Sequence, residues 1–348
     1  MAYNRLDKAL LQMGFHSLPG QEMLSYMEDV FLSRSLRPLT IRQPVFISSL
    51  ARSGTTLLLQ LLMKTGIFAA QTYREMPFVM CPVLWKNLAS RFYLKGESKE
   101  RAHKDGVEVS YDSEEAFEEI LWRHFFKKKY TKYSLECFFA DETHEEFEGF
   151  FRNHIRKILL LNQTKDRTGL RYLSKNNANI GRLPYLNRVF PEAVFVVPVR
   201  HPVPHVRSLR TQHASFSRMQ KDDPFVKKYM DYLGHFEFGM SFKRIDFFQQ
   251  YRKVDSGWAL DDENFWIHYW CDSMRYLKAL KEKLDNIVIV KYERLCADPQ
   301  KELENVFDRL DLPASKIAQI ASFVRMEDKR FPVPSAYTEA KELYDAMG

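Results

Sequence analysis

Residues 44–59 read PVFISSLARSGTTLLL, an apolar run followed by a polar turn and a second apolar run. This pattern predicts a buried strand, a tight turn and a helix. Backbone N–H groups at such a turn, together with the positive end of the helix dipole, bind phosphate or sulfate oxygens without a metal. We therefore predict an anion-binding loop made of Arg52, Ser53, Gly54, Thr55 and Thr56.

The loop lacks the lysine of the nucleoside-triphosphate P-loop, GxxxxGK[ST]. When the two sequences are aligned, Ser49 occupies the position of the motif's first glycine and Thr55 occupies the position of its lysine. Arg52 lies two residues before Gly54 instead. A nucleotide kinase, which would need ATP and Mg²⁺, is an alternative that the missing lysine disfavours.

A second strand ends in another cation. Residues 193–199 predict a buried strand that stops at Arg200, and Pro202 suits the first turn of the helix that follows. Ser208 lies about two helical turns after Arg200, so its hydroxyl and the guanidinium can share one phosphate. Both residues are therefore predicted to bind an anion.

Apolar strands that alternate with helices predict a mostly parallel sheet with helices on both faces. Residues 170–175 form another such strand, which ends at Lys175. Ligands of these sheets bind at the carboxyl ends of the strands. We therefore expect Arg52, Lys175 and Arg200 to meet in one site.

These segments resemble sulfotransferases that use 3′-phosphoadenosine-5′-phosphosulfate (PAPS). In that family the first loop binds the 5′-phosphosulfate, and the arginine and serine at the second strand bind the 3′-phosphate. A third family signature, Ile287–Leu295 followed by Asp298-Pro299, is expected to be structural. The resemblance spans Pro44 to Leu310 and implies PAPS as donor and adenosine 3′,5′-bisphosphate (PAP) as product.

The resemblance also implies a three-layer α/β/α fold in a single domain over residues 1–348, with helical insertions. Within it we expect an N-terminal helical segment at 1–43, a variable acceptor-side insertion at 86–167 and a polar segment at 216–258 that could close over the cofactor as a lid. Met23, Met27, Val30 and Phe31 share one helix face and are expected to pack in the core.

Sulfuryl transfer needs an aligned acceptor oxygen, cations near the leaving phosphate and a base. The resemblance implies Arg52 and Lys175 as the cations. The histidine base of many cytosolic members is replaced by Asn177, and asparagine cannot accept the proton. Glu75 lies nearest the glutamate base of other members and is the predicted base. His16, His103 and His201 are the alternatives.

Two family features are missing. A late glycine-rich loop that wraps the 3′-phosphate has no counterpart between Gly257 and Gly348, where Lys329 and Arg330 are the candidates to replace it. Leu57 stands where a tryptophan often stacks on adenine. These departures concern the binding of the cofactor, and they leave the predicted reaction class unchanged.

The composition is that of a globular protein, with 348 residues, 45% hydrophobic content and a formal net charge of +7. We assign the excess positive charge to a polyanionic cofactor and expect no nucleic-acid partner. Four scattered cysteines give no metal-ligand spacing, so no metal is expected. The polar N-terminus and the lack of a long apolar run predict a cytoplasmic protein. The resemblance to sulfotransferases implies an organic hydroxyl acceptor. A non-catalytic module that binds nucleotides or polyanions is the other alternative.

Overall fold

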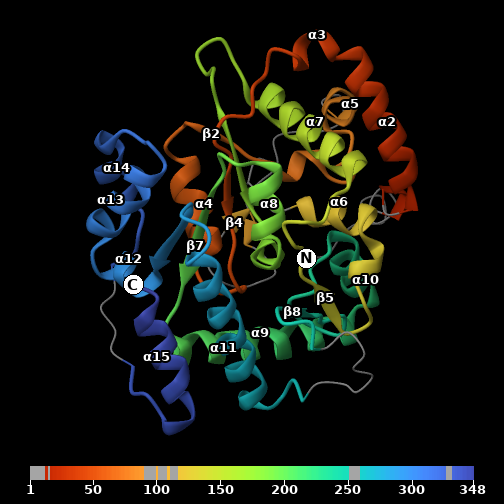
Figure 1. Cartoon of the computed structure of the whole chain (residues 1–348). Coiled ribbons are helices and arrows are strands. Elements are labelled where there is room, and N and C mark those ends of the chain that lie inside the picture. The colour runs from red at the N-terminus through yellow and green to blue at the C-terminus, as the bar shows by residue number, and fades with distance from the viewer. Residues whose placement is uncertain are drawn as a thin grey trace.

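A parallel five-stranded sheet forms the centre of the molecule (Figure 1). The computed structural model describes residues 12–14, 16–89, 99–100, 108–109, 117–250, 259–326 and 331–348. The strand order is β2-β6-β1-β7-β9, and every neighbouring pair is parallel. The strands are β1 (Val45–Ile47), β2 (Phe68–Ala69), β6 (Arg171–Lys175), β7 (Val194–Val199) and β9 (Ile287–Lys291). The predicted α/β fold with a mostly parallel central sheet is therefore confirmed.

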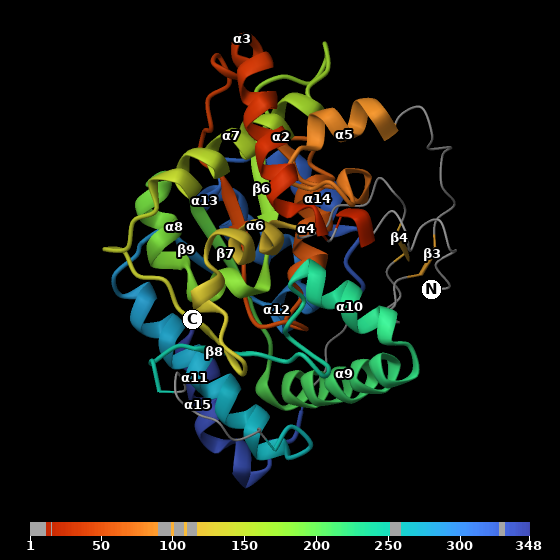
Figure 2. The ribbon, with the colours of Figure 1, turned by 90° about the vertical axis from the view of Figure 1, so that its right-hand side faces the viewer.

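Helices cover both faces of the sheet, as the two perpendicular views show (Figures 1 and 2). Alternate side chains of β1 divide between two cores, with Phe46 in one and Val45 and Ile47 in the other. The core around Val45 is completed by α4 (Thr55–Met63), α12 (Tyr292–Ala297), α13 (Pro299–Arg309) and α14 (Ile317–Ala321). The core around Phe46 is completed by α6 (Glu118–Phe125), α7 (Glu145–Asn162), α8 (Leu183–Val189), α9 (Pro202–Asp222), α11 (Glu263–Lys281) and α15 (Thr338–Ala346).

Shorter elements surround these layers. Two small sheets lie apart from the central one: an antiparallel pair, β3 (Lys99–Glu100) with β4 (Glu108–Val109), and a parallel pair, β5 (Ser134–Glu136) with β8 (Arg244–Asp246). Further helices among the described residues are α2 (Leu18–Phe31), α3 (Ser33–Leu36), α5 (Pro82–Ala89) and α10 (Pro224–Leu233). Short 3₁₀ turns occur at η1 (Tyr73–Glu75), η2 (Lys127–Lys129), η3 (Asn177–Gly181), η4 (Ala314–Lys316) and η5 (Ser335–Tyr337).

Pro198 lies in β7, an interior strand, where proline usually costs a ladder hydrogen bond. The Val196 carbonyl accepts from the Ser48 N–H, so the even-numbered residues of β7 face β1. Because β1 ends at Ile47, the position of Pro198 lies beyond the last β1 residue. The missing N–H therefore costs little, and the strand ends beside the predicted anion-binding loop.

The prediction that the apolar stripe of α2 packs in the core is wrong. Met23, Met27, Val30 and Phe31 are 61%, 42%, 73% and 77% exposed. The helix packs instead through its polar face, because the fully buried Lys157 of α7 forms ion pairs with Glu28 at 3.1 Å and Asp29 at 2.7 Å. A buried ammonium needs such counter-charges, and they orient α2 with its apolar stripe outward, at the periphery of the molecule (Figure 1).

The segment expected to be a polar lid is more ordered than its composition predicts. Residues 216–250 comprise the end of α9, helix α10, an extended stretch and β8. Phe216, Phe225, Phe238 and Phe242 are buried in the main core. The aromatic residues thus fix this part of the chain, while residues 251–258 lie outside the described residues.

Candidate functional site

The loop between β1 and α4 has the strand-turn-helix form that the sequence predicts. Arg52 and Gly54 have left-handed backbones, with φ of 71° and 106°. A Cβ atom added to Gly54 would lie 2.7 Å from Cδ2 of Tyr292, the first residue of α12. Only glycine tolerates both the positive φ and the short distance to the Tyr292 ring. The third sequence signature, which contains Tyr292, therefore packs directly against the anion-binding loop.

His205 of α9 holds the same loop from the other side. Trp270 Nε1 of α11 donates to His205 Nδ1 at 3.1 Å, so the proton of His205 lies on Nε2 and is donated to the Ala51 carbonyl at 2.8 Å. Burial lowers the pKa of His205 to about 3, which keeps the ring neutral. Neither His205 nor Trp270 was predicted from the sequence, since their spacing is also that of ordinary core residues.

Arg52, Arg200 and Ser208 come together as predicted. Nε of Arg52 donates to the Ser208 hydroxyl at 3.2 Å, and Nη1 of Arg200 donates to the Arg52 carbonyl at 3.1 Å. The Arg200 guanidinium also lies 5.0 Å from the centre of the Tyr292 ring. The two predicted anion sites are therefore adjacent.

Glu293, the next residue of the third signature, braces the start of α9. Its carboxylate accepts from the His201 N–H at 3.0 Å and from the Tyr344 hydroxyl at 2.8 Å. The signature thus has the structural role that was expected of it.

Several buried donors of the site have no hydrogen-bond partner among the described residues. They are the hydroxyls of Ser49 and Ser53 and Nε of Arg200. Buried polar groups are almost always paired, so donors left over beside a loop that opens a helix are available to an anion. The residues present therefore fit the phosphate and sulfate groups of the implied cofactor.

A second group of polar side chains follows β6. Thr55 Oγ1 lies 3.2 Å from Oδ1 of Asn177, and Nδ2 of Asn177 donates to Glu237 at 2.9 Å. Because a carboxylate only accepts, Glu237 fixes the orientation of the amide, and the Thr55 hydroxyl donates to it. Glu237 was missed from the sequence, because it follows α10 and is far from every motif.

The pKa of Glu237 is about 2. Burial acts to raise it, but the hydrogen bond and charge of His235, the amide of Asn177 and the charge of Lys175 together lower it. Lys175, at the carboxyl end of β6 as predicted, is thus electrostatically coupled to this carboxylate. Glu237 remains ionised at neutral pH beside the predicted catalytic lysine.

Two adjacent glutamates at the start of α6 hold the chain around Lys175. Glu119 binds both terminal nitrogens of the buried Arg182, at 2.6 and 2.8 Å, and accepts from Asn176 at 2.9 Å. Glu118 accepts from the Tyr172 hydroxyl at 2.6 Å. The predicted acceptor-side insertion is therefore anchored directly to the strand that carries Lys175.

Glu75, the predicted base, ends the η1 turn and is buried. Its Oε2 accepts from the Thr72 N–H at 2.6 Å and from the Thr72 hydroxyl at 2.9 Å, which forms a capping box. Burial raises the pKa of Glu75 above its ordinary value. The next residue, Met76, shares a core cluster with Leu50 and Ala51 of the anion-binding loop.

The other predicted residues are placed as follows. Thr56 lies in the first turn of α4, and Ser53 is fully buried. Of the alternative bases, His16 is exposed, and His201 precedes α9 with its ring against Tyr344. His103, Lys329 and Arg330 lie outside the described residues.

The comparisons with known proteins agree with the motifs. The family model described as "Sulfotransferase family" matches residues 44–243, and because this is more than half of the chain, the protein belongs to the sulfotransferase family. Membership supports sulfuryl transfer as the general class of activity. A search of the curated proteins found no match.

Three solved structures are similar to this chain. Sulfotransferase STF1 from Mycobacterium tuberculosis H37Rv is 14% identical, with a TM-score of 0.47 over 91% of this chain and 80% of that one. Sulfotransferase STF9 from Mycobacterium avium is 9% identical, with a TM-score of 0.49 over the same shares. The sulfotransferase domain from the curacin biosynthetic pathway is 13% identical, with a TM-score of 0.40 over 89% of this chain and 98% of that one.

A search of the described helices for one long and apolar enough to cross a membrane found none.

Replacement of Gly54 by alanine should destabilise the loop, because the new Cβ meets both an unfavourable φ and the Tyr292 ring. We expect a loss of about 1–3 kcal/mol in the free energy of unfolding, measured by urea titration. Gly66→Ala is the matched control, since Gly66 also has a positive φ, 76°, but has no atom within 4 Å of the added Cβ. Equal losses in the two variants would contradict the contact with Tyr292.

His205 should make stability depend on pH. Its folded pKa is lowered to about 3, so its contribution is complete above the unfolded value near 6.5 and is lost as the pH falls towards 3. In His205→Gln, stability should fall less steeply with acid, by up to about 1.4 kcal/mol per pH unit. Urea titrations at pH 7.5, 6 and 5 measure this difference. Parallel curves for the two proteins would exclude the assigned role.

Proposed function

We propose that the protein transfers a sulfuryl group from PAPS to a hydroxyl, or less readily an amine, of a small-molecule or glycoconjugate acceptor. The main support is the set of buried donors, Ser49, Ser53 and Arg200, that lie unpaired where the family binds phosphate and sulfate. The match to the sulfotransferase family model adds to it. The enzyme would be a cytoplasmic protein of one domain that needs no metal.

The cofactor would lie across the two adjacent anion sites. Ser53, Gly54, Thr55 and Thr56 would bind the 5′-phosphosulfate through backbone N–H groups and hydroxyls. Arg200 and Ser208 would bind the 3′-phosphate. Arg52, which already contacts Ser208, lies between the sites and would have to turn towards the phosphosulfate when both are filled.

The reaction requires positive charge at the leaving phosphate and a base at the acceptor. Arg52 and Lys175 would neutralise the charge that develops on the leaving oxygen. The acceptor oxygen would attack sulfur in line with that oxygen, and Glu75 would take the acceptor proton. PAP would be released with the charge of the broken sulfur–oxygen bond on its phosphate.

Glu75 and Glu237 have opposite pKa shifts, which supports different roles for the two carboxyl groups. Burial raises the pKa of Glu75, so its carboxylate would be the stronger proton acceptor. Its surroundings lower the pKa of Glu237 to about 2, so Glu237 would be a weak base that orients Asn177 and Lys175. Pairs of carboxyl groups with separated pKa values are a recurring sign of divided acid–base roles.

The choice of acceptor would depend on the insertion at 86–167, which is fixed to the strand of Lys175 through Glu118 and Glu119. The segment at 216–258 would cover the site, since Glu237 reaches Asn177 from it. A lid of this kind would be hinged on well-packed aromatic residues, and only its polar stretches would move.

Calorimetric titration with PAP tests the cofactor assignment. We expect selective binding of PAP over AMP and ATP–Mg²⁺, and a loss of at least about tenfold in affinity in Arg200→Ala, because the 3′-phosphate loses its bidentate partner. Arg218→Ala, on the same helix α9 but far along it, is the control and should bind like the parent. Equal affinity for ATP, or no binding of PAP, would rule out the PAPS assignment.

Glu75→Gln tests the base. Glutamine preserves the capping box with Thr72, so the fold and PAP affinity should persist while turnover falls by about 10²–10⁴. In the parent protein the rate should rise with pH as the Glu75 carboxyl loses its proton. This rise should be absent in Glu75→Gln. Glu237→Gln should lower turnover but retain this pH dependence. Near-normal turnover of Glu75→Gln would transfer the role to another residue.

A further inference from the structure

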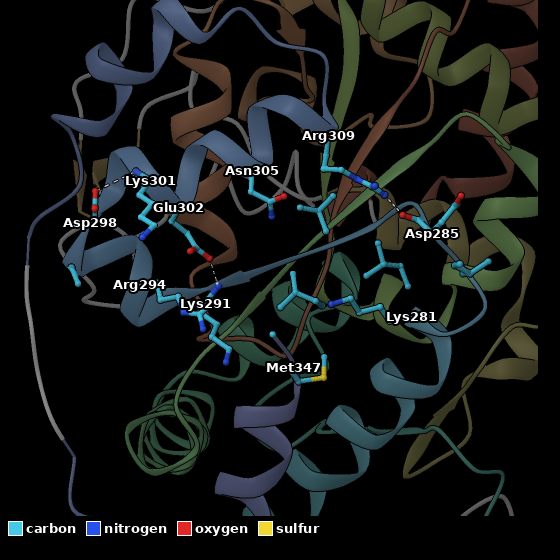
Figure 3. Close-up of a pocket in the computed structure, with 16 residues that line it drawn as sticks. Lys281, Asp285, Lys291, Arg294, Asp298, Lys301, Glu302, Asn305, Arg309 and Met347 are labelled. Carbon is cyan, nitrogen blue, oxygen red and sulfur yellow. Dashed lines mark hydrogen bonds between the residues drawn. The ribbon is translucent and has the colours of Figure 1, made fainter.

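A groove with a cavity volume of about 910 Å³ runs along β9, the last strand of the sheet. Figure 3 shows β9 crossing it, with α13 on one side and the end of α11 and the C-terminal residues on the other. The groove lies on the outer edge of β9, while the cofactor site lies at the carboxyl ends of β1 and β7. The proposed sulfotransferase reaction does not use it.

The register shows which backbone groups face this groove. The Asn286 carbonyl accepts from the Phe195 N–H, so the even-numbered residues of β9 pair with β7. In a parallel pair the odd residues then direct both N–H and C=O to the opposite side. The Lys291 N–H confirms this direction, because it donates at 2.8 Å to Glu302 of α13. Ile287 and Ile289 therefore present their backbone donors and acceptors to the groove.

The charge of the groove is mainly positive. Five basic side chains line it: Lys281, Lys291, Arg294, Lys301 and Arg309. Three acidic side chains line it as well, Asp285, Asp298 and Glu302. Two of these carboxylates already accept from backbone N–H groups, Asp298 from Lys301 and Glu302 from Lys291. With five cations and three carboxylates, the lining would still present a net positive charge to a ligand.

We propose that this groove binds an extended acidic segment of a partner protein, which adds a strand to the sheet beside β9. Strand addition supplies hydrogen bonds from backbone to backbone, and the flanking side chains supply specificity. The partner backbone would pair with Ile287 and Ile289, and its acidic side chains would meet Arg294 and Lys301. The exposed edge of a sheet is a template for such pairing. This binding does not depend on the enzymatic activity.

The test uses the full-length protein and the fluorescent peptide acetyl-Glu-Val-Glu-Val-Glu-Val-amide, followed by anisotropy. We expect saturable binding of this probe and none of the matching Lys-Val peptide. N-methylation of alternate residues removes the strand-forming N–H groups while keeping the charge. Two such peptides exist, one N-methylated at the odd positions and one at the even positions. One of these two N-methylated frames should bind at least about tenfold more weakly than the unmodified peptide.

Two variants locate the site. Ile289→Pro removes an N–H that faces the groove and no ladder bond with β7, so the sheet should persist while the peptide affinity falls. Lys301→Glu reverses one lining charge and should also weaken binding, whereas Lys221→Glu on α9 makes the same charge change outside the groove and should not. The circular dichroism spectrum and the urea midpoint of each variant report whether the fold is intact.

Three outcomes would overturn the proposal. They are no saturable binding of the acidic peptide, unchanged binding of both N-methylated frames, and equal effects of Lys301→Glu and Lys221→Glu. A single-stranded oligonucleotide that binds more tightly than the peptide, with Lys301→Glu weakening it, would instead identify a polyanion site.

Discussion

The contact between Gly54 and Tyr292 is the constraint on which the arrangement of the site depends. A Cβ atom added to Gly54 would lie only 2.7 Å from the Tyr292 ring. The loop after β1 and the helix after β9 are therefore too close for any side chain at position 54. The same ring lies under Arg200, at the end of β7. Three strand ends, far apart in sequence, are thus held at fixed separations around one aromatic side chain. The left-handed backbones of Arg52 and Gly54 are possible because this packing, with the His205 bond to Ala51, over-determines the loop.

The sequence predicts those features that depend on local chemistry. The parallel sheet follows from apolar strands alternating with helices, and the meeting of Arg52, Arg200 and Ser208 follows from their places at strand ends and on the next helix. The family motifs carried this information, because each one combines a strand, a turn and a helix start. Assignment of the site residues to catalysis and cofactor binding stays a prediction.

Features that depend on distant partners could not be predicted. The exposed stripe of α2 has the period of a core face, and only the position of Lys157 on α7 explains why the opposite face is buried. Glu237 is one acidic residue among many until the fold brings it to Asn177. His205 could have been weighed as a base, but its proton is held on Nε2 because Trp270, 65 residues away, donates to its Nδ1. In each case a charge or a proton is fixed by a residue from another element.

The bidentate pair of Glu119 and Arg182 has a consequence for how this enzyme can diverge. Glu119 belongs to the segment predicted to be a variable insertion, whereas Arg182 and Asn176 belong to the segment that carries Lys175. An exchange of the insertion without its glutamate would leave a guanidinium uncompensated in the core, at a cost of about 3–5 kcal/mol. Sequences exchanged into this segment are therefore tolerated only where they keep an anion beside Arg182.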